Sequence, residues 1–354
     1  MNPREDIHAL DRIGLERALT DLAQPAWRVS QIVRWLYQRG ADSFDEMTDL
    51  PADLRAELGE RFALVAPRVV DRQVSADGTR KYLVRLGDGV QVETVGLPDG
   101  PRLTVCFSTQ AGCAMGCAFC ATGRGGLIRS LAPGEMVDQV TVVSRDFGER
   151  VTNAVAMGQG EPFAVYDAVL AALRFMNAED GPGIGARHLT VSTCGLLPGI
   201  RAFASEPEQF TLAVSLHSAV QATRDRLMPG VRAYPLDRLR SELAAYASAT
   251  GRRPTVEYAL IGGANDTAAE LEALVEWCSG VHCHVNLIPV NPVDGAGLSR
   301  PGRGAAERFR RALSKAGIEV SVRAERGADI DAACGQLRQR SNATPGSDPI
   351  SPAP

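Results

Sequence analysis

The chain has 354 residues, 45% apolar and 23% charged, which is ordinary for a globular protein with one large and one smaller domain. Its formal net charge of −4 excludes the overall basic excess typical of many nucleic-acid-binding proteins. No apolar run reaches the length of a transmembrane helix, and the N-terminus is acidic and polar, unlike a signal peptide. The cysteines do not suggest a secreted disulfide framework. We therefore expect a cytoplasmic protein without membrane contact.

Residues 1–100 predict a small N-terminal accessory domain of α+β type. Residues 1–62 carry apolar side chains at helical spacing, for example at Ile32 and Leu36. Residues 63–100 change to short alternating runs of polar and apolar residues, and the dipeptides Asp77-Gly and Asp88-Gly between these runs are typical of hairpin turns. We therefore expect helices followed by a few antiparallel strands.

Residues 101–338 alternate between predicted strands and helices, which indicates a parallel sheet covered by helices. About six such units fall short of a closed eightfold barrel, so the predicted fold is an α/β protein with a partial (β/α)6 barrel. Residues 339–354, rich in Pro, Ser and Asn, predict a disordered tail. The predicted strands are 103–108, 151–158, 188–194, 210–216, 254–261, 283–290 and 318–323, and the predicted helices are 133–146, 164–176, 235–249, 266–279 and 303–316.

Three cysteines, Cys113, Cys117 and Cys120, share one loop rich in Gly and Ala after the first predicted barrel strand. Three thiolates at this spacing can hold three corners of an iron–sulfur cubane, which leaves the fourth iron open to a ligand. A closed zinc site would need a second ligand pair, and none follows here. This spacing resembles that of the radical S-adenosylmethionine (SAM) superfamily, in which the open iron chelates SAM and the cofactor carries the radical chemistry.

Further candidate residues follow the other predicted strands, where ligands bind in parallel sheets. Glu161 could accept a hydrogen bond from the SAM ammonium group, although an ordinary turn would also explain the glycines around it. His217 and the serines could bind the SAM carboxylate or ribose, and Asn291 could bind adenine; a structural histidine and a turn flanked by prolines are the alternatives. The predicted SAM-binding residues are Gly160, Glu161, Ser192, Ser215, Leu216, His217 and Asn291.

Almost the whole chain, from about residue 10 to 338, resembles the RlmN/Cfr family of radical SAM RNA methyltransferases. The stretch from Arg326 to Leu337 is the most specific, because ordinary radical SAM enzymes have no cysteine at the position of Cys334. The resemblance is carried by Trp35-Leu-Tyr, Phe44-Asp-Glu-Met-Thr-Asp-Leu, Asp77-Gly-Thr, Val92-Glu-Thr-Val, Ser108-Thr-Gln-Ala-Gly-Cys-Ala, Gly160-Glu-Pro, Val191-Ser-Thr, Ser215-Leu-His, Asn286-Leu-Ile-Pro and Arg326-Gly-Ala-Asp-Ile-Asp-Ala-Ala-Cys-Gly-Gln-Leu.

The resemblance implies methyl transfer to C2, or in Cfr members C8, of an adenosine in 23S ribosomal RNA, and in some members also in tRNA. It implies two SAM molecules and a [4Fe–4S] cluster. The cysteine that matches Cys334 carries the methyl group, the one that matches Cys106 resolves the RNA adduct and leaves a disulfide, and Glu93 matches the proton acceptor; a charge at a strand edge is the plainer interpretation of Glu93. We expect a monomer that receives electrons from a reductant such as flavodoxin or ferredoxin.

Two departures from the family pattern indicate a divergent member: Gln159 replaces a usual methionine, and Val290 stands where an aromatic residue is frequent. Two other hypotheses stay open. One is a radical SAM enzyme with the same chemistry that acts on a small molecule or peptide, which would not need the accessory domain. The other is a non-catalytic RNA-binding protein, which the complete cysteine set argues against.

Overall fold

The computed structural model describes residues 4–290, 298–323, 326–332 and 336–337. The predicted sites Asn291 and Cys334 and the predicted tail 339–354 lie outside these residues. No helix in the described part of the chain is both long and apolar enough to cross a membrane.

The N-terminal residues form a cluster of short helices, as predicted. The Asp11 side chain accepts a hydrogen bond from the backbone N–H of Gly14, which caps the first helix. Gly40 has a φ of 60° and ends the last turn after residue 39 in the left-handed conformation that glycine adopts easily. The elements are β1 (Glu5–Asp6), α1 (Arg12–Asp21), α2 (Arg28–Arg34), η2 (Trp35–Arg39), α3 (Ala52–Arg61) and β2 (Phe62–Ala63), and β1 pairs with β2.

Three antiparallel accessory strands follow: β3 (Arg68–Val74), β4 (Arg80–Arg85) and β5 (Gln91–Asp99). The predicted hairpin turns are confirmed, with Gly78 at a φ of 83° and Gly89 at a φ of 89°. Strand β5 also pairs antiparallel with β6 (Arg102–Cys106), the first barrel strand. The accessory strands therefore extend the barrel sheet and do not form a sheet of their own.

The barrel strands pair in parallel in chain order, which confirms the predicted partial barrel. The full sheet runs from β14 through β13, β12, β11, β10, β9 and β6 to β5, β4 and β3, and among the described residues its end strands do not pair to close it. The remaining strands are β9 (Asn153–Ala156), β10 (Leu189–Thr193), β11 (Thr211–Ser215), β12 (Thr255–Leu260), β13 (His284–Pro289) and β14 (Glu319–Val322).

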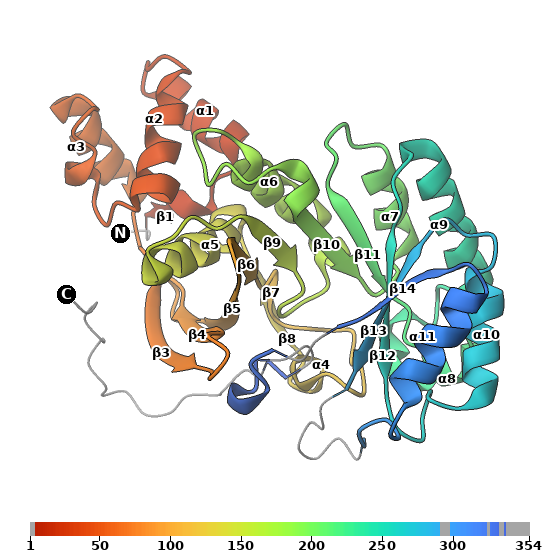
Figure 1. Ribbon diagram of the computed structural model, residues 1–354. Coiled ribbons are helices and arrows are strands. Elements are labelled where there is room, and N and C mark those ends of the chain that lie inside the picture. The colour runs from red at the N-terminus through yellow and green to blue at the C-terminus, as the bar shows by residue number, and fades with distance from the viewer. Residues whose placement is uncertain (1–3, 291–297, 324–325, 333–335, 338–354) are drawn as a thin grey trace.

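Helices cover the outer face of this curved sheet (Figure 1). All five predicted barrel helices are present, and one buried apolar cluster joins the N-terminal helices, the strands and these helices. This burial of apolar area is the main stabilising contribution to the fold. The barrel helices are α5 (Pro133–Phe147), α6 (Tyr166–Asn177), α7 (Leu197–Ala204), α8 (Gln221–Leu227), α9 (Leu236–Thr250), α10 (Ala268–Cys278) and α11 (Ala305–Lys315).

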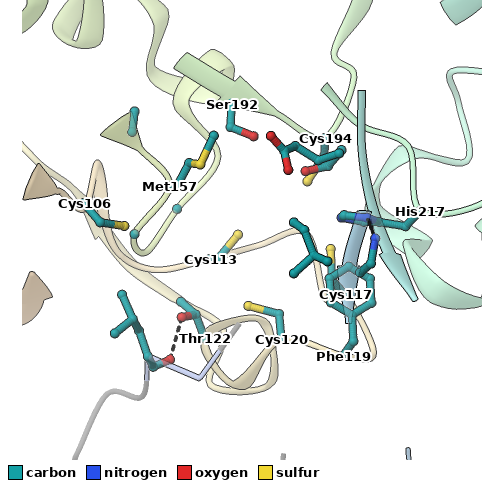
Figure 2. Close-up of a pocket in the computed structure, with 18 of the residues that line it drawn as sticks. Cys106, Cys113, Cys117, Phe119, Cys120, Thr122, Met157, Ser192, Cys194 and His217 are labelled. Carbon is teal, nitrogen blue, oxygen red and sulfur yellow. Dashed lines mark hydrogen bonds between the residues drawn. The ribbon is translucent and has the colours of Figure 1, made fainter. Parts of the chain in front are cut away.

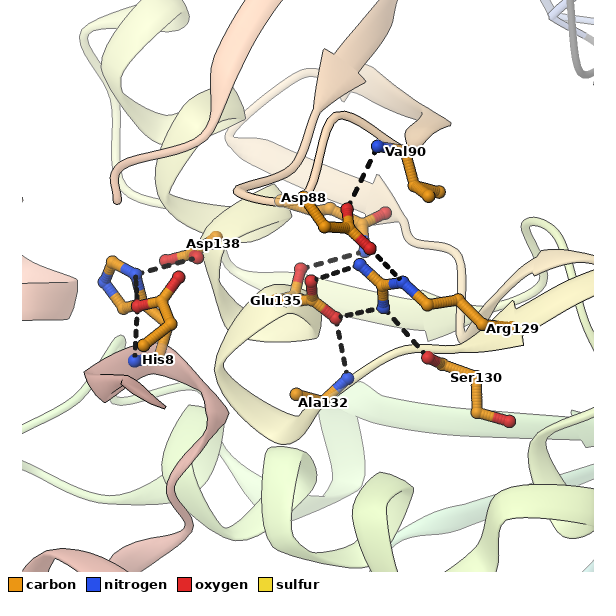
Figure 3. A network of polar contacts seen from close by, with 10 residues as sticks. His8, Asp88, Val90, Arg129, Ser130, Ala132, Glu135 and Asp138 are labelled. Carbon is orange, nitrogen blue, oxygen red and sulfur yellow. Dashed lines mark hydrogen bonds and ion pairs between the residues drawn. The ribbon is translucent and has the colours of Figure 1, made fainter. Parts of the chain in front are cut away.

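A two-stranded hairpin, β7 (Gln110–Gly112) and β8 (Leu127–Ser130), encloses the cysteine loop and the short helix α4 (Ala121–Arg124). Gly112 has a φ of 79°, and a Cβ atom there would lie 2.0 Å from the Gly126 carbonyl oxygen, so only glycine fits this crossing. Arg129 on β8 donates to Asp88 at 2.7 Å and to Glu135 at 2.7 and 2.8 Å (Figure 3). This pair of contacts fixes the hairpin to the β4–β5 turn and to the start of α5.

Candidate active site

One cavity at the carboxyl ends of the parallel strands collects most of the predicted site residues (Figure 2). This is where ligands bind in sheets of this kind, because the strand-end loops meet there. Its wall also includes residues of the segment after β14. The predicted residues that line the cavity are Cys106, Cys113, Cys117, Cys120, Gly160, Glu161, Ser192, Ser215 and His217.

The three loop cysteines point their sulfur atoms into the same part of the cavity (Figure 2). Gly116, with a φ of 63°, allows the tight turn between Cys113 and Cys117. Burial raises the pKa of the Cys113 thiol to about 12 and also raises the pKa of Cys120. Without a bound cation, burial therefore favours the protonated thiols of Cys113 and Cys120, and iron would supply the positive charge that stabilises their thiolates.

Glu161 is a buried residue of the cavity wall and is held by hydrogen bonds from neighbouring loops. Its carboxylate accepts hydrogen bonds from the Phe163 N–H at 2.9 Å, the Thr193 hydroxyl at 2.7 Å and the Cys194 N–H at 2.6 Å. Burial raises the pKa of Glu161, and these three donors oppose that effect. The side chain thus ties the loop after β9 to the loop after β10 and has room for few further donors.

Gly160 gives this loop its close approach to the sheet. It has a φ of 104°, and a Cβ atom there would lie 2.7 Å from side-chain atoms of Thr109 and Gln110. The Glu161 N–H in turn donates to the Gln110 side chain at 2.9 Å. Any residue with a side chain at position 160 would push the loop away from the cavity floor.

His217 is a neutral hydrogen-bond donor in this structure. Its Nδ1 accepts a hydrogen bond from the Ala259 N–H at 3.0 Å, so the ring proton is on Nε2. Burial first, and the charge of Arg224 second, lower the pKa of His217 to about 3. The ring also meets Phe119 of the cysteine loop edge to face, at 4.7 Å between centroids.

One predicted SAM contact, Leu216, does not reach the cavity as the neighbouring serines do. Ser192 and Ser215, at the ends of β10 and β11, are half-buried and line the cavity. Leu216 instead lies fully buried in the main apolar core and does not line the cavity, and its backbone N–H donates to the Glu257 carbonyl. Only the backbone of Leu216 can therefore contribute to a site here.

Two of the residues predicted for methyl transfer, Cys106 and Glu93, lie on the neighbouring strands β6 and β5, whereas Cys334 lies outside the described residues. Cys106 lines the cavity and packs in one buried cluster with Ala332 and Leu337, which lie on either side of position 334 in the sequence. Glu93 is 3% exposed and does not line the cavity; its carboxylate lies 3.6 Å from the Lys81 ammonium group. Glu93 is therefore a buried, paired charge and not a charge at a strand edge.

Family models match both parts of the chain: the radical SAM superfamily at residues 107–278, and the N-terminal domain of ribosomal RNA large subunit methyltransferases at residues 6–64. A protein of Pelotomaculum thermopropionicum called probable dual-specificity RNA methyltransferase RlmN is 48% identical over 95% of this chain and 92% of its own length. This chain belongs to the RlmN family. An RlmN relative of Synechococcus elongatus is 48% identical over 91% of this chain and 90% of its own length.

A solved structure agrees with this assignment. The crystal structure of a radical SAM methyltransferase from Sphaerobacter thermophilus has a TM-score of 0.89 and 44% identity, and the match covers 95% of this chain and 100% of that one. The protein is thus a radical SAM methyltransferase, and its family implies a [4Fe–4S] cluster and SAM.

The cavity of this RlmN-family chain suits these cofactors in its donor chemistry. Its wall includes the three thiols of the cysteine loop, the buried Glu161 carboxylate and the neutral His217 imidazole. Within the described residues no three His, Cys, Asp or Glu side chains are arranged to hold a single metal ion. Each of the three loop thiolates could bind a different iron atom of a cubane cluster.

Sequence reasoning missed two cavity residues near the cysteine loop. Cys194 lines the cavity, and a hydrogen bond with the Cys117 side chain, together with burial, raises the pKa of its thiol. Glu257 on β12 also lines the cavity and accepts a hydrogen bond from Asn286 at 2.9 Å. Glu257 could have been found from the sequence, because it is a charged residue inside an otherwise apolar predicted strand. The spacing of Cys194 does not distinguish it from a cysteine that only packs in the core.

Gln159 and Val290, the two departures from the family pattern, occupy different places in the structure. Val290 lines the cavity, so its small side chain enlarges the space where an aromatic residue is frequent. Gln159 is 1% exposed and lies outside the cavity wall. The two departures therefore affect different properties, namely the shape of the cavity and the packing behind it.

Proposed function

We propose that this protein methylates C2, in preference to C8, of an adenosine in structured RNA, with 23S ribosomal RNA and tRNA as substrates. The observation that carries the proposal is the packing of Ala332 and Leu337 against Cys106 beside the three loop cysteines. It brings the segment that contains Cys334 to the cavity, as a covalent methyl carrier requires. The names of the RlmN relatives support RNA as the substrate, and the preference for C2 follows from likeness to RlmN.

The cofactor sites follow from the cavity wall. Cys113, Cys117 and Cys120 would hold the [4Fe–4S] cluster. When bound, the cluster and SAM together supply a carbon radical that can abstract hydrogen from an unactivated C–H bond. We propose two SAM molecules in each turnover, one as the methyl donor and one as the radical source. The proposed SAM contacts are Gly160, Glu161, Ser192, Ser215, the backbone of Leu216, His217 and Asn291.

The chain's own residues would divide the transfer into steps. The Cys334 thiolate takes a methyl group and holds it as a thioether, which is covalent catalysis. After the carbon is joined to adenine, Glu93 would accept the proton displaced from the ring carbon, and the electron pair of that C–H bond stays in the ring. One electron must then leave the adduct, and the bound cluster would serve as its acceptor. Cys106 then attacks the Cys334 sulfur: a disulfide forms, the S–C bond breaks, and its electron pair takes up a proton to give the methyl product.

The rest of the chain would serve delivery of substrate and electrons. We propose that residues 1–100 form the accessory domain that contacts RNA, that residues 101–338 form the barrel with its carrier cysteine, and that residues 339–354 form a tail. We further propose a monomer in the cytoplasm, where its RNA substrates lie, reduced by a protein such as flavodoxin or ferredoxin.

Mass spectrometry of nucleosides from ribosomal RNA and tRNA tests the function. A strain that lacks this protein should lose methyladenosine with the methyl group on C2, and re-expression should restore it, whereas Cys334→Ala should not. Loss of the C8 isomer instead would overturn the preference for C2. Unchanged RNA in the deletion strain would overturn the RNA substrate altogether and favour a small molecule or peptide.

The purified enzyme tests the two cysteines. The Cys334 peptide should carry about +14 Da, the mass of a CH2 unit, as a covalent methyl carrier does. Cys106→Ala should keep this mass and accumulate RNA joined to the protein, because the resolving sulfur is missing. The two-cysteine mechanism would be contradicted if the modification of about +14 Da lay on another cysteine, or if Cys106→Ala turned over normally. The triple variant with Ala in place of Cys113, Cys117 and Cys120 should bind no cluster iron.

A further inference from the structure

Three neighbouring strands carry one cross-strand row of residues that ends at the proposed resolving cysteine, Cys106. Lys81 on β4 lies opposite Val95 on β5, and Val95 lies opposite Cys106 on β6. Residues directly opposite one another in a sheet project from the same face. Lys81 and Cys106 therefore face the same side of the sheet, and Glu93, two residues before Val95, shares that face.

Lys81 is a buried lysine with two charged or polar partners. It is 5% exposed, its Nζ lies 3.6 Å from Glu93 Oε1, and it donates a hydrogen bond of 3.3 Å to the Asp331 carbonyl. Lysine is almost never buried unless it is paired. A buried ion pair often stabilises a fold no better than well-packed apolar residues would, so stability alone does not account for it.

The segment that Lys81 contacts is docked on the accessory strands. We call residues 326–332 and 336–337 the carrier segment. The β3–β4 turn holds it through Asp329, which accepts hydrogen bonds from the Ser75 hydroxyl at 2.6 Å and the Ala76 N–H at 3.2 Å. The Gly327 N–H donates to Asp77 at 3.0 Å. Together with the Lys81 contact, these bonds fix the backbone on the N-terminal side of position 334.

The other end of the carrier segment is held by the cysteine loop. The Thr122 hydroxyl on α4 donates to the Leu337 carbonyl at 2.7 Å (Figure 2). The carrier segment is thus anchored to the accessory strands before position 334 and to the helix next to Cys120 after it. Among these anchors, Lys81 also pairs with the proposed proton acceptor.

We propose that Lys81 is a positioning residue for methyl transfer, which keeps Glu93 charged and fixes the carrier segment through the Asp331 carbonyl. This inference rests on the proposed function. An ammonium group next to a buried carboxylate favours the ionised form, and only that form can accept a proton. One side chain thereby couples the group that removes the proton to the segment that carries the methyl group. The accessory strands then serve the chemistry directly, in addition to any role in RNA binding.

The test uses the full-length, cluster-loaded enzyme with three variants. Lys81→Met removes the charge and keeps the chain length, and Lys81→Arg restores the charge. Arg80→Met is the matched control: Arg80 is the preceding residue on the same strand, and it pairs with Asp146 at 2.7 Å, away from the cavity. Iron content, SAM binding and melting temperature are measured for each variant, followed by single-turnover methylation of an RNA substrate.

Lys81→Met should lower single-turnover methylation at least about tenfold while iron content and SAM affinity stay within about twofold of the unmodified enzyme. Lys81→Arg should recover part of the rate, and Arg80→Met should behave like the unmodified enzyme. Because part of the effect of Lys81 acts through Glu93, Lys81→Met should lower the rate by a smaller factor in the Glu93→Gln background than in the unmodified enzyme. Hydrogen exchange should be faster in the carrier segment of Lys81→Met and unchanged in Arg80→Met.

Three results would overturn the proposal: methylation by Lys81→Met at the normal rate, a loss of iron or SAM binding that accounts for the slower rate, or unchanged exchange in the carrier segment. Failure of the proposed function gives a different result. In that case the unmodified enzyme would itself carry no methyl group on Cys334 and methylate no RNA, and the role of Lys81 would fall with it.

Discussion

Gln159 is the side chain whose replacement we expect to stabilise this protein most directly. It is 1% exposed, and neither its Oε1 nor its Nε2 has a hydrogen-bond partner among the described residues. Methionine, usual at this position in the family, has a similar shape and no strongly polar atoms. Gln159→Met should therefore remove two unsatisfied polar groups and leave no cavity.

The size of the effect follows from desolvation. An unsatisfied buried polar group costs about 1–3 kcal/mol, and a volume-conserving exchange in a core usually costs under about 1.5 kcal/mol. We expect a net gain of about 1–3 kcal/mol in the free energy of unfolding. An unfolding entropy of about 2.1 cal/mol/K for each of 354 residues converts this gain to a rise in Tm of about 1–4 °C.

Gln139 is the matched control, because it is equally buried but fully bonded. Its Oε1 accepts a hydrogen bond from the Ser108 N–H at 2.8 Å, and its Nε2 donates to the Ser108 carbonyl at 2.9 Å. Gln139→Met should leave both backbone groups of Ser108 unsatisfied and destabilise the protein by about 1–3 kcal/mol. Anaerobic calorimetry of the loaded enzyme should give shifts of opposite sign. A lower Tm for both variants would refute the argument from hydrogen bonding.

Three further predictions concern charge and the cavity. Burial raises the pKa of Asp138, next to His8 (Figure 3), to about 6. Its ionisation therefore destabilises the fold increasingly as the pH rises from about 4, the unfolded value, through about 6. Asp138→Asn should gain at most about 3 kcal/mol at pH 8 and nothing below pH 4, and equal gains in urea unfolding at both pH values would contradict this. Glu161→Gln places an amide NH2 against its hydrogen-bond donors and should weaken SAM binding by about 1.5–3 kcal/mol in calorimetric titration, so an unchanged Kd would exclude the proposed contact. Because burial lowers the pKa of His217 to about 3, its ¹⁵N signals should stay those of the neutral Nε2–H form from pH 5 to 8. A titration of these signals in that range would disprove the assignment of a neutral ring.

Much of the fold could be predicted from the sequence because its signals are local. Hairpin turns at Gly78 and Gly89 need only the freedom of glycine to adopt positive φ, and the strand and helix runs need only their period of apolar residues. The cysteine loop was equally local, since three thiols within eight residues cannot lie far apart. The placement of Glu161 and His217 at one edge followed from the rule that parallel strands end together.

The tertiary structure decided which distant residues meet. Cys106 and the carrier segment are separated by more than two hundred residues, and the packing of Ala332 and Leu337 against the first barrel strand, together with hydrogen bonds to the accessory strands and α4, brings them together. Sequence alone presented Glu93 as a possible strand-edge charge and said nothing of Lys81, because an ion pair between adjacent strands depends on register. Continuity of the accessory strands with the barrel sheet, which sets that register, is a property of the whole fold and not of any single segment.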